Sequence, residues 1–138
     1  MSISGRDISV TDDERPILLL TCSGISHAGQ LTTLTGHWLY CLHPAMVSRH
    51  LKLTNLKRAL ESELADDEYM IVVDGCEKCC AKERIDLIGK VPDVHLVATR
   101  EGITKRGMEE PRYDEIEGLS QGIMRTVRNG RRTNEESD

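Results

Sequence analysis

The chain has 138 residues, of which 38% are hydrophobic and 30% are charged, and its net charge is −5. This length suits one domain with a core of its own, and the absence of Phe, with one Trp and three Tyr, makes that core mostly aliphatic. The shortage of aromatic residues and of basic charge disfavours a nucleic-acid partner. No apolar run is long enough to span a membrane, and the N-terminus lacks the apolar core of a signal peptide. We therefore expect a cytoplasmic protein with no membrane span.

The elements follow one another in a strand–helix alternation. Residues 1–15 are polar and predict a loose arm that offers a surface to a protein partner or to a second copy of the chain. Residues 131–138 predict a polar tail that frays. Between these ends, residues 16–130 predict a single domain. In chain order, its elements are a buried strand at 16–22, a helix at 29–44, a weak strand at 45–51, an amphipathic helix at 54–64, a buried strand at 68–75, a helix at 79–89, a strand at 93–99 and a helix at 111–130.

Details of the helices follow from spacing and from helix-stop signals. The apolar residues Leu31, Leu34, Trp38 and Cys41 or Leu42 define the buried face that we expect for the first helix. Gly89 predicts the end of the helix at 79–89, and Asn129-Gly130 predicts the end of the last helix.

The alternation predicts a small three-layer α/β sandwich. Right-handed crossovers between successive strands give a mostly parallel four-stranded sheet with helices on both faces, of the Rossmann or flavodoxin-like kind. We expect the strand order 2-1-3-4, which makes the strands at 16–22 and 68–75 neighbours. Ligand crevices in such sheets open at the carboxyl ends of the strands, where the strand order reverses.

Four of the five cysteines are expected at this crevice. Cys22 ends the first strand, and Cys76 follows the strand at 68–75, so neighbouring strands about 5 Å apart bring the two thiols together. Cys79 and Cys80 open the next helix, where the positive end of the helix dipole favours ionised thiolates. Gly75 allows a sharp turn, and Asp74 is expected to accept hydrogen bonds from loop amides or to orient a ligand. Such clustered, reduced thiols point to metal binding or to redox chemistry.

The remaining candidates are weaker. Cys41 lies in line with the apolar residues of the first helix, which favours a core cysteine. His27 follows Cys22 in the loop and is the one histidine placed to join the site, although an exposed loop histidine is the simpler interpretation. His95 is expected to be a half-buried sheet residue. Ser26 is the expected N-cap of the first helix.

Phosphatase catalysis by Cys22 is excluded by the loop that follows it. The layout of residues 22–30, "CSGISHAGQ", is also that of low-molecular-weight tyrosine phosphatases and arsenate reductases, which use an Arg six residues after the cysteine. Ala28 occupies that position here, and no general base or nucleotide motif stands out elsewhere. The sequence therefore predicts no specific enzymatic reaction.

Three motifs together resemble the DGC-domain proteins, a family of small prokaryotic proteins named for an Asp-Gly-Cys motif. They are "CSGISHAGQL", "VVDGCEKCCAK" and "HLVATREGITK", and the resemblance covers about residues 16–127. It implies a zinc site built from cysteines, with no settled activity. It implies Cys22, Cys76 and Cys80 as ligands. The fourth ligand is Cys79 in the "CEKCC" turn, which we favour, or Cys41, if "HWLYCLH" forms the second strand.

Two functions that use the thiols are consistent with these residues, and a third is an interaction module in which the thiols only stabilise the fold and the acidic arm or the last helix binds a partner. The first is a zinc-binding domain, with Cys22, Cys76, Cys79 and Cys80 as ligands, acting as a metal carrier, a sensor or a docking module. The second is a thiol-based redox or persulfide carrier, or a protein that holds an iron–sulfur cluster.

Overall fold

The structure is a computed structural model, and it describes residues 15–22, 24–53, 64 and 68–136. The expected N-terminal arm, apart from Arg15, and the helix expected at 54–64, apart from Leu64, lie outside the described residues. The described elements are β1 (Ile17–Cys22), α3 (His27–Leu42), β2 (Val47–Leu53), β3 (Tyr69–Asp74), α5 (Cys80–Leu87), β4 (Val94–Val97), the 3-10 helix η1 (Ala98–Glu101) and α6 (Tyr113–Glu136).

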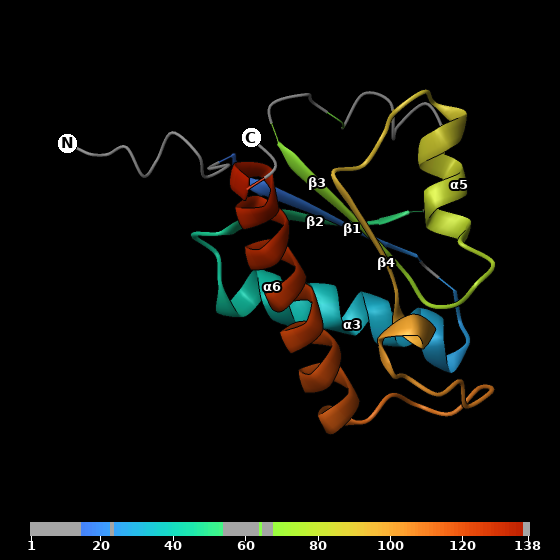
Figure 1. The fold of residues 1–138 in the computed structure, drawn as a ribbon. Helices are drawn as coiled ribbons and strands as arrows, with labels where there is room; N and C mark the ends of the chain where they lie inside the picture. The colour runs from blue at the N-terminus through green and yellow to red at the C-terminus, as the bar shows by residue number, and fades with distance from the viewer. Residues whose placement is uncertain (1–14, 23, 54–63, 65–67, 137–138) are drawn as a thin grey trace.

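The four strands form one all-parallel sheet in the order β2-β1-β3-β4, as the sequence predicts. The aliphatic run of β1 lies at the centre, between β2 and β3. Ile17 pairs with Tyr69 and Thr21 with Val73, so β1 and β3 end at the same edge of the sheet. Figure 1 shows α3 and α6 on one face of the sheet and α5 on the other.

Alternate residues of the central strands fill two separate hydrophobic cores, because successive side chains of a strand point to opposite faces. Leu19 and Ile71 belong to the core beneath α3 and α6. Leu18 and Val72 belong to the core beneath α5. Both faces of β1 and β3 are therefore buried, which explains why these strands read as continuous aliphatic runs.

Helix α3 begins at the expected cap, because the side chain of Ser26 accepts a hydrogen bond from the backbone N–H of Gly29 at 3.3 Å. Its buried face differs from the expected one. Leu34 is 43% exposed, and Cys41 is also exposed. The buried positions are His27, Ala28, Gly29, Leu31, Thr32, Thr35, Gly36 and Leu39. Many of these residues are small or polar because α3 lies close to the sheet. A Cβ on Gly36, for example, would lie 2.4 Å from the ring of His50 in β2.

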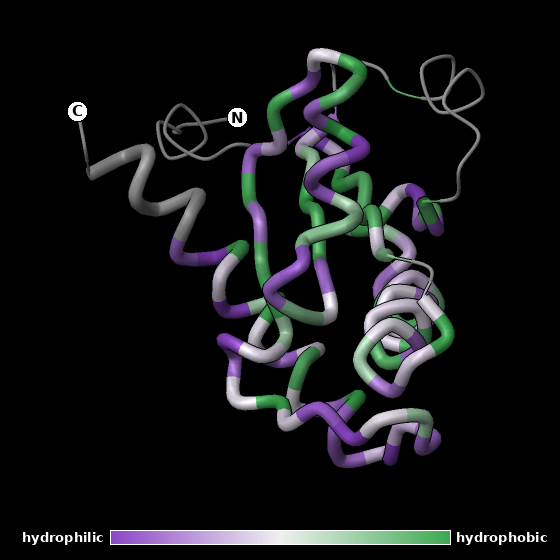
Figure 2. The backbone as a smooth tube through the Cα atoms, turned by 90° about the vertical axis from the view of Figure 1, so that its right-hand side faces the viewer, coloured by the Kyte–Doolittle hydropathy of each residue, from purple (hydrophilic) through white to green (hydrophobic). Residues whose placement is uncertain are grey.

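Helix α6 runs to Glu136, so the expected stop at Asn129-Gly130 is wrong. One Gly inside a helix costs only about 1 kcal/mol relative to Ala, and the Arg and Glu residues that follow favour helix. The segment before α6 is mainly hydrophilic and forms the purple lower end of the tube in Figure 2. No described helix is both long enough and apolar enough to cross a membrane.

Gly75 is required for close packing between the end of β3 and the start of α3. A Cβ at this position would lie 2.8 Å from the carbonyl carbon and oxygen of Ala28. Backbone atoms cannot swing away as a flexible side chain can, so any side chain at position 75 pushes α3 off the sheet.

We expect Gly75→Ala to lower the free energy of unfolding by about 1–3 kcal/mol, the usual cost of overpacking. The matched control is Gly118→Ala in α6, where a Cβ would meet nothing within 4 Å. That change should stabilise the protein by roughly 0.5–1 kcal/mol, because Ala favours helix over Gly. Urea unfolding measures both variants, and equal effects of the two changes would contradict this role for Gly75.

Candidate metal site

A pocket of about 370 Å³ opens at the carboxyl edge of β1 and β3, beside the starts of α3 and α5. The sheet order brings together residues more than 50 positions apart in sequence, because Cys22 ends β1 and Asp74 ends β3. Its lining comprises Cys22, Gly24, Ser26, Ala28, Gly29, Asp74, Gly75, Cys76, Lys78, Cys79, Cys80, Arg84 and Lys105. All four cysteines that the sequence singles out therefore face one cavity, together with three basic side chains.

These four thiols differ in their surroundings, and none forms a disulfide. Cys22, Cys76 and Cys79 are partly buried, whereas Cys80 is exposed. The Sγ atom of Cys22 lies 3.3 Å from Oγ1 of Thr32 in α3. The pocket thus contains one exposed thiol, that of Cys80, and three partly buried thiols.

Asp74 connects the end of β3 to α5 and β4. Its side chain is only 1% exposed, and Oδ1 accepts a hydrogen bond from the backbone N–H of Ala81 at 2.7 Å. Oδ2 accepts a hydrogen bond from the N–H of Lys82 at 3.1 Å and lies 2.8 Å from Nε2 of His95. The expectation that Asp74 accepts hydrogen bonds from nearby amides is confirmed, and its carboxylate takes over the capping of α5.

Cys79 directly precedes α5 in an unusual backbone conformation. With φ 51° and ψ 48° it is left-handed, and its side chain makes no capping hydrogen bond. Among the described residues it is the one non-glycine residue with positive φ, a conformation that costs an ordinary residue about 1–2 kcal/mol. Partial burial, and then the charge of Asp74, raise the pKa of the Cys79 thiol. The expectation of easy ionisation at this helix start is therefore wrong for Cys79.

Asp74, Cys79 and His95 form a group that could hold a metal ion. A carboxylate oxygen, the Sγ atom and a ring nitrogen all lie within 4.8 Å of one another. Across the described part of the chain, the thiols of Cys22, Cys76 and Cys80 belong to no group this tight.

His95 is half-buried in β4, as expected, but its place at the site was missed by the sequence reasoning. Its backbone pairs with Val72 in β3. Val72 and Asp74 are two positions apart on β3 and therefore share a face of the sheet. Because His95 pairs with Val72, it lies on that same face. Strand order and this alternation together were enough to place it there.

Cys41 lies near the end of α3, away from the pocket, and the expectation of a core cysteine is wrong. It is exposed, and its Sγ atom lies 3.5 Å from Nε2 of His37. Because α3 continues to Leu42, residues 37–43 are not the second strand. Cys41 therefore does not lie at the crevice, as it would if it belonged to the second strand.

His27 is fully buried as the first residue of α3, so the expectation of an exposed loop histidine is also wrong. Its Nε2 lies 3.0 Å from Oε1 of Glu115, and its backbone N–H donates to the carbonyl of Gly107 at 2.9 Å. His27 is absent from the pocket lining. The imidazole instead joins the start of α3 to the start of α6.

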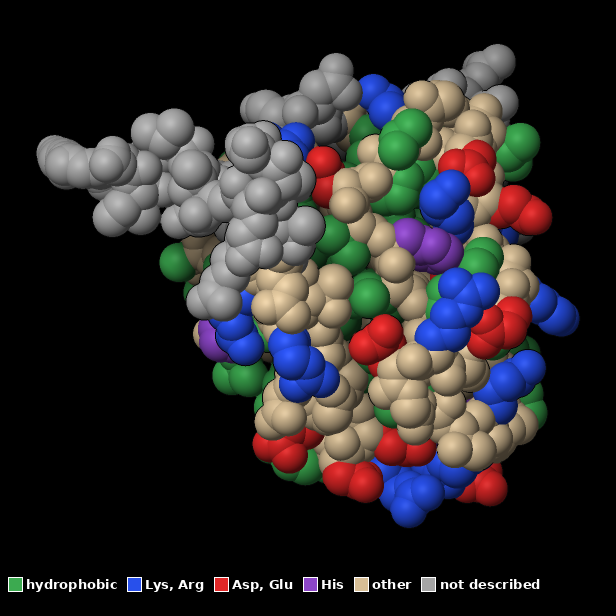
Figure 3. Space-filling view, in the orientation of Figure 1, with side chains coloured by type: hydrophobic (Ala, Val, Ile, Leu, Met, Phe, Trp, Pro, Cys, Tyr) green, Lys and Arg blue, Asp and Glu red, His purple; other side chains and the backbone are tan. Residues whose placement is uncertain are grey.

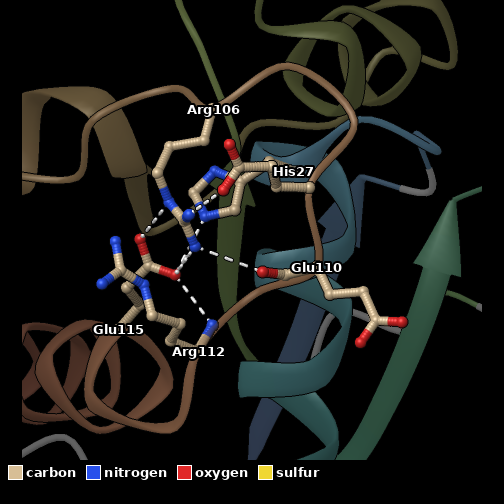
Figure 4. A network of polar contacts seen from close by, with 6 residues as sticks. His27, Arg106, Glu110, Arg112 and Glu115 are labelled. Carbon is tan, nitrogen blue, oxygen red and sulfur yellow. Dashed lines mark hydrogen bonds and ion pairs between the residues drawn. The ribbon is translucent and has the colours of Figure 1, made fainter.

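Glu115 is the centre of this polar network (Figure 4). Arg106 donates to both of its carboxylate oxygens, at 3.1 and 2.9 Å, and the backbone N–H of Arg112 donates to Oε1 at 2.8 Å. These contacts, led by the hydrogen bonds from Arg106, lower the pKa of Glu115 to about 2. The network fixes the 102–112 segment, which carries Lys105 to the pocket.

We expect Glu115→Gln to lower the urea midpoint at pH 7. Because folding lowers the pKa of Glu115 from 4.5 to about 2, its stabilising effect is full above pH 4.5 and is lost as the pH falls toward 2. The gap in urea midpoint between wild type and variant should therefore narrow from pH 6 to pH 3. Glu117→Gln, at an exposed position of α6, is the control. A gap that is constant with pH would contradict the assignment.

The comparisons with known proteins give one match. A family model described as the DGC domain matches residues 18–123. Neither the curated proteins nor the solved structures contain a match. The matched region includes nearly all of β1, the whole pocket lining and the first part of α6.

Proposed function

Since the chain belongs to the DGC-domain family, we propose that it is a metal-binding domain, with zinc bound by Cys22, Cys76, Cys79 and Cys80. The observation that carries this proposal is that all four cysteines line one pocket. Zinc in proteins takes four tetrahedral ligands, and thiolate sulfur is among its preferred donors. The resemblance to DGC-domain proteins points to the same type of site.

The charge around the pocket also supports bound thiolates. Four thiolates and one Zn²⁺ carry a net charge of −2, which is costly to hold in a partly buried site. Lys78, Arg84 and Lys105 line the same pocket and offset that charge. On the face shown in Figure 3, by contrast, basic and acidic side chains are interspersed.

An exchangeable site suits a carrier, a sensor or a docking module better than a purely structural one. Cys80 is exposed, so an incoming chelator or partner protein can reach one ligand directly. A reducing cytoplasm would keep the thiols available for metal. The same exposed thiol would serve a redox or persulfide carrier, or an iron–sulfur protein, and the experiment below separates these cases.

We expect protein purified without oxygen to contain one zinc ion per chain, measured by elemental analysis together with thiol titration. Cys76→Ser should lose most of the metal while keeping its circular dichroism spectrum. Cys41→Ser is the matched control and should retain the metal, because Cys41 is exposed on α3 and does not line the pocket.

Other outcomes count against zinc. A folded, metal-free wild type in which all five cysteines titrate as free thiols would overturn the proposal. Iron with acid-labile sulfide would favour the cluster, and a reversible internal disulfide would favour redox exchange.

A further inference from the structure

We propose that His95 is a ligand of this metal, and that the ion binds among Asp74, Cys79 and His95 in a mixed sulfur, nitrogen and oxygen shell. The inference rests on the proposed metal-binding function and changes its donor set. Cys79 remains a ligand, while one of the other three cysteines of the pocket completes the four-coordinate shell.

The spacing of the three donors is close to what a metal ion needs. Tetrahedral zinc with bonds of about 2.0–2.3 Å separates its ligand atoms by roughly 3.3–3.8 Å. The three donor atoms lie within 4.8 Å of one another, and the contact between Asp74 and His95 is 2.8 Å. Small side-chain shifts that break the hydrogen bond between Asp74 and His95, and replace it with bonds from both donors to the ion, are therefore enough to admit the ion. Gathering Cys22, Cys76 and Cys80 to the same spacing requires more rearrangement.

Capping explains only part of this arrangement. The N–H groups of Ala81 and Lys82 already give Asp74 its capping role. That role requires neither a histidine on β4 nor a cysteine at position 79, whose side chain makes no capping bond. Each carboxylate oxygen can accept two hydrogen bonds, and within the described residues Oδ1 accepts only that from Ala81. Oδ1 therefore keeps one acceptor position that capping does not use.

The backbone at Cys79 supports the same assignment. A left-handed conformation is unfavourable for cysteine and would suit glycine. Strained residues of this type gather at ligand-binding sites, where the surrounding structure holds them in place. Here the strain places the Cys79 thiol beside Asp74 and His95, whereas the adjacent Cys80, the first residue of α5, is more exposed and belongs to no such group among the described residues. The two neighbouring thiols consequently have different positions, and one ion is not required to bind both.

The experiment is X-ray absorption at the zinc edge on full-length protein loaded with one equivalent of zinc. We expect sulfur together with nitrogen or oxygen neighbours in the wild type, with the multiple scattering that an imidazole ligand produces. His95→Gln should lose the imidazole signal and, in a competition with a chromophoric chelator, weaken zinc binding by more than the roughly 10- to 100-fold that loss of an outer-shell partner costs. The matched control is His43→Gln, an exposed histidine outside the pocket.

The outcomes separate this inference from the function on which it rests. An all-sulfur shell in the wild type overturns the role of His95 and leaves the zinc-binding function intact. A wild type that binds no zinc overturns both. The wild-type spectrum decides the point even if His95→Gln does not fold. A second variant, Cys79→Gly, should bind zinc more weakly but unfold at a higher urea concentration in its metal-free form. Unchanged zinc affinity in Cys79→Gly would also contradict the inference.

Discussion

The buried carboxylate of Asp74 is the contact on which the arrangement of the site depends. It lies at the end of β3, where it accepts hydrogen bonds from the first turn of α5 and contacts His95 on β4. A charge buried to this extent is tolerated only when it is well paired. Three elements are therefore tied to one side chain, and the cysteines before α5 take their positions from it.

Close backbone contact supports this arrangement from the other side of the pocket. Gly75 allows the end of β3 to approach Ala28, and Gly29 allows the start of α3 to approach Gly24, since a Cβ there would lie 2.7 Å from the carbonyl oxygen of Gly24. The loop after β1 and the turn after β3 consequently come together as two walls of one cavity. The Gly of the Asp-Gly-Cys motif thus has a packing role of its own, beside the hydrogen-bonding role of Asp74.

Much of the fold could be predicted from the sequence because its signals are strong and local. The aliphatic runs of β1 and β3 indicate strands buried on both faces, and the alternation with helices predicts parallel strands, for which we expected the order 2-1-3-4. That order alone predicted that Cys22 and Cys76 would share a crevice. The buried face of α3 was misjudged because hydrophobic spacing selected Leu34 and Cys41, whereas contact with the sheet required small residues.

The missed residues depend on contacts between distant segments. His27 is buried because Glu115, 88 positions away, offers it a partner. No local pattern carries that information. His95 was missed for a different reason, since strand order and alternation were available but were applied only to the cysteines. Polar residues on any strand of the sheet, the edge strand β4 included, can therefore be placed by the same geometric reasoning as clustered thiols.

The contact between Asp74 and His95 has a consequence for the order of folding. It joins residues 21 positions apart and forms only when β4 has paired with β3. The first turn of α5 can form locally, but the histidine arrives with the last strand of the sheet. Non-local pairing of this kind is slow compared with helix formation. The donor group would therefore be assembled late, after the sheet, so that a nascent chain exposes separate thiols and only the finished domain presents all three side chains together.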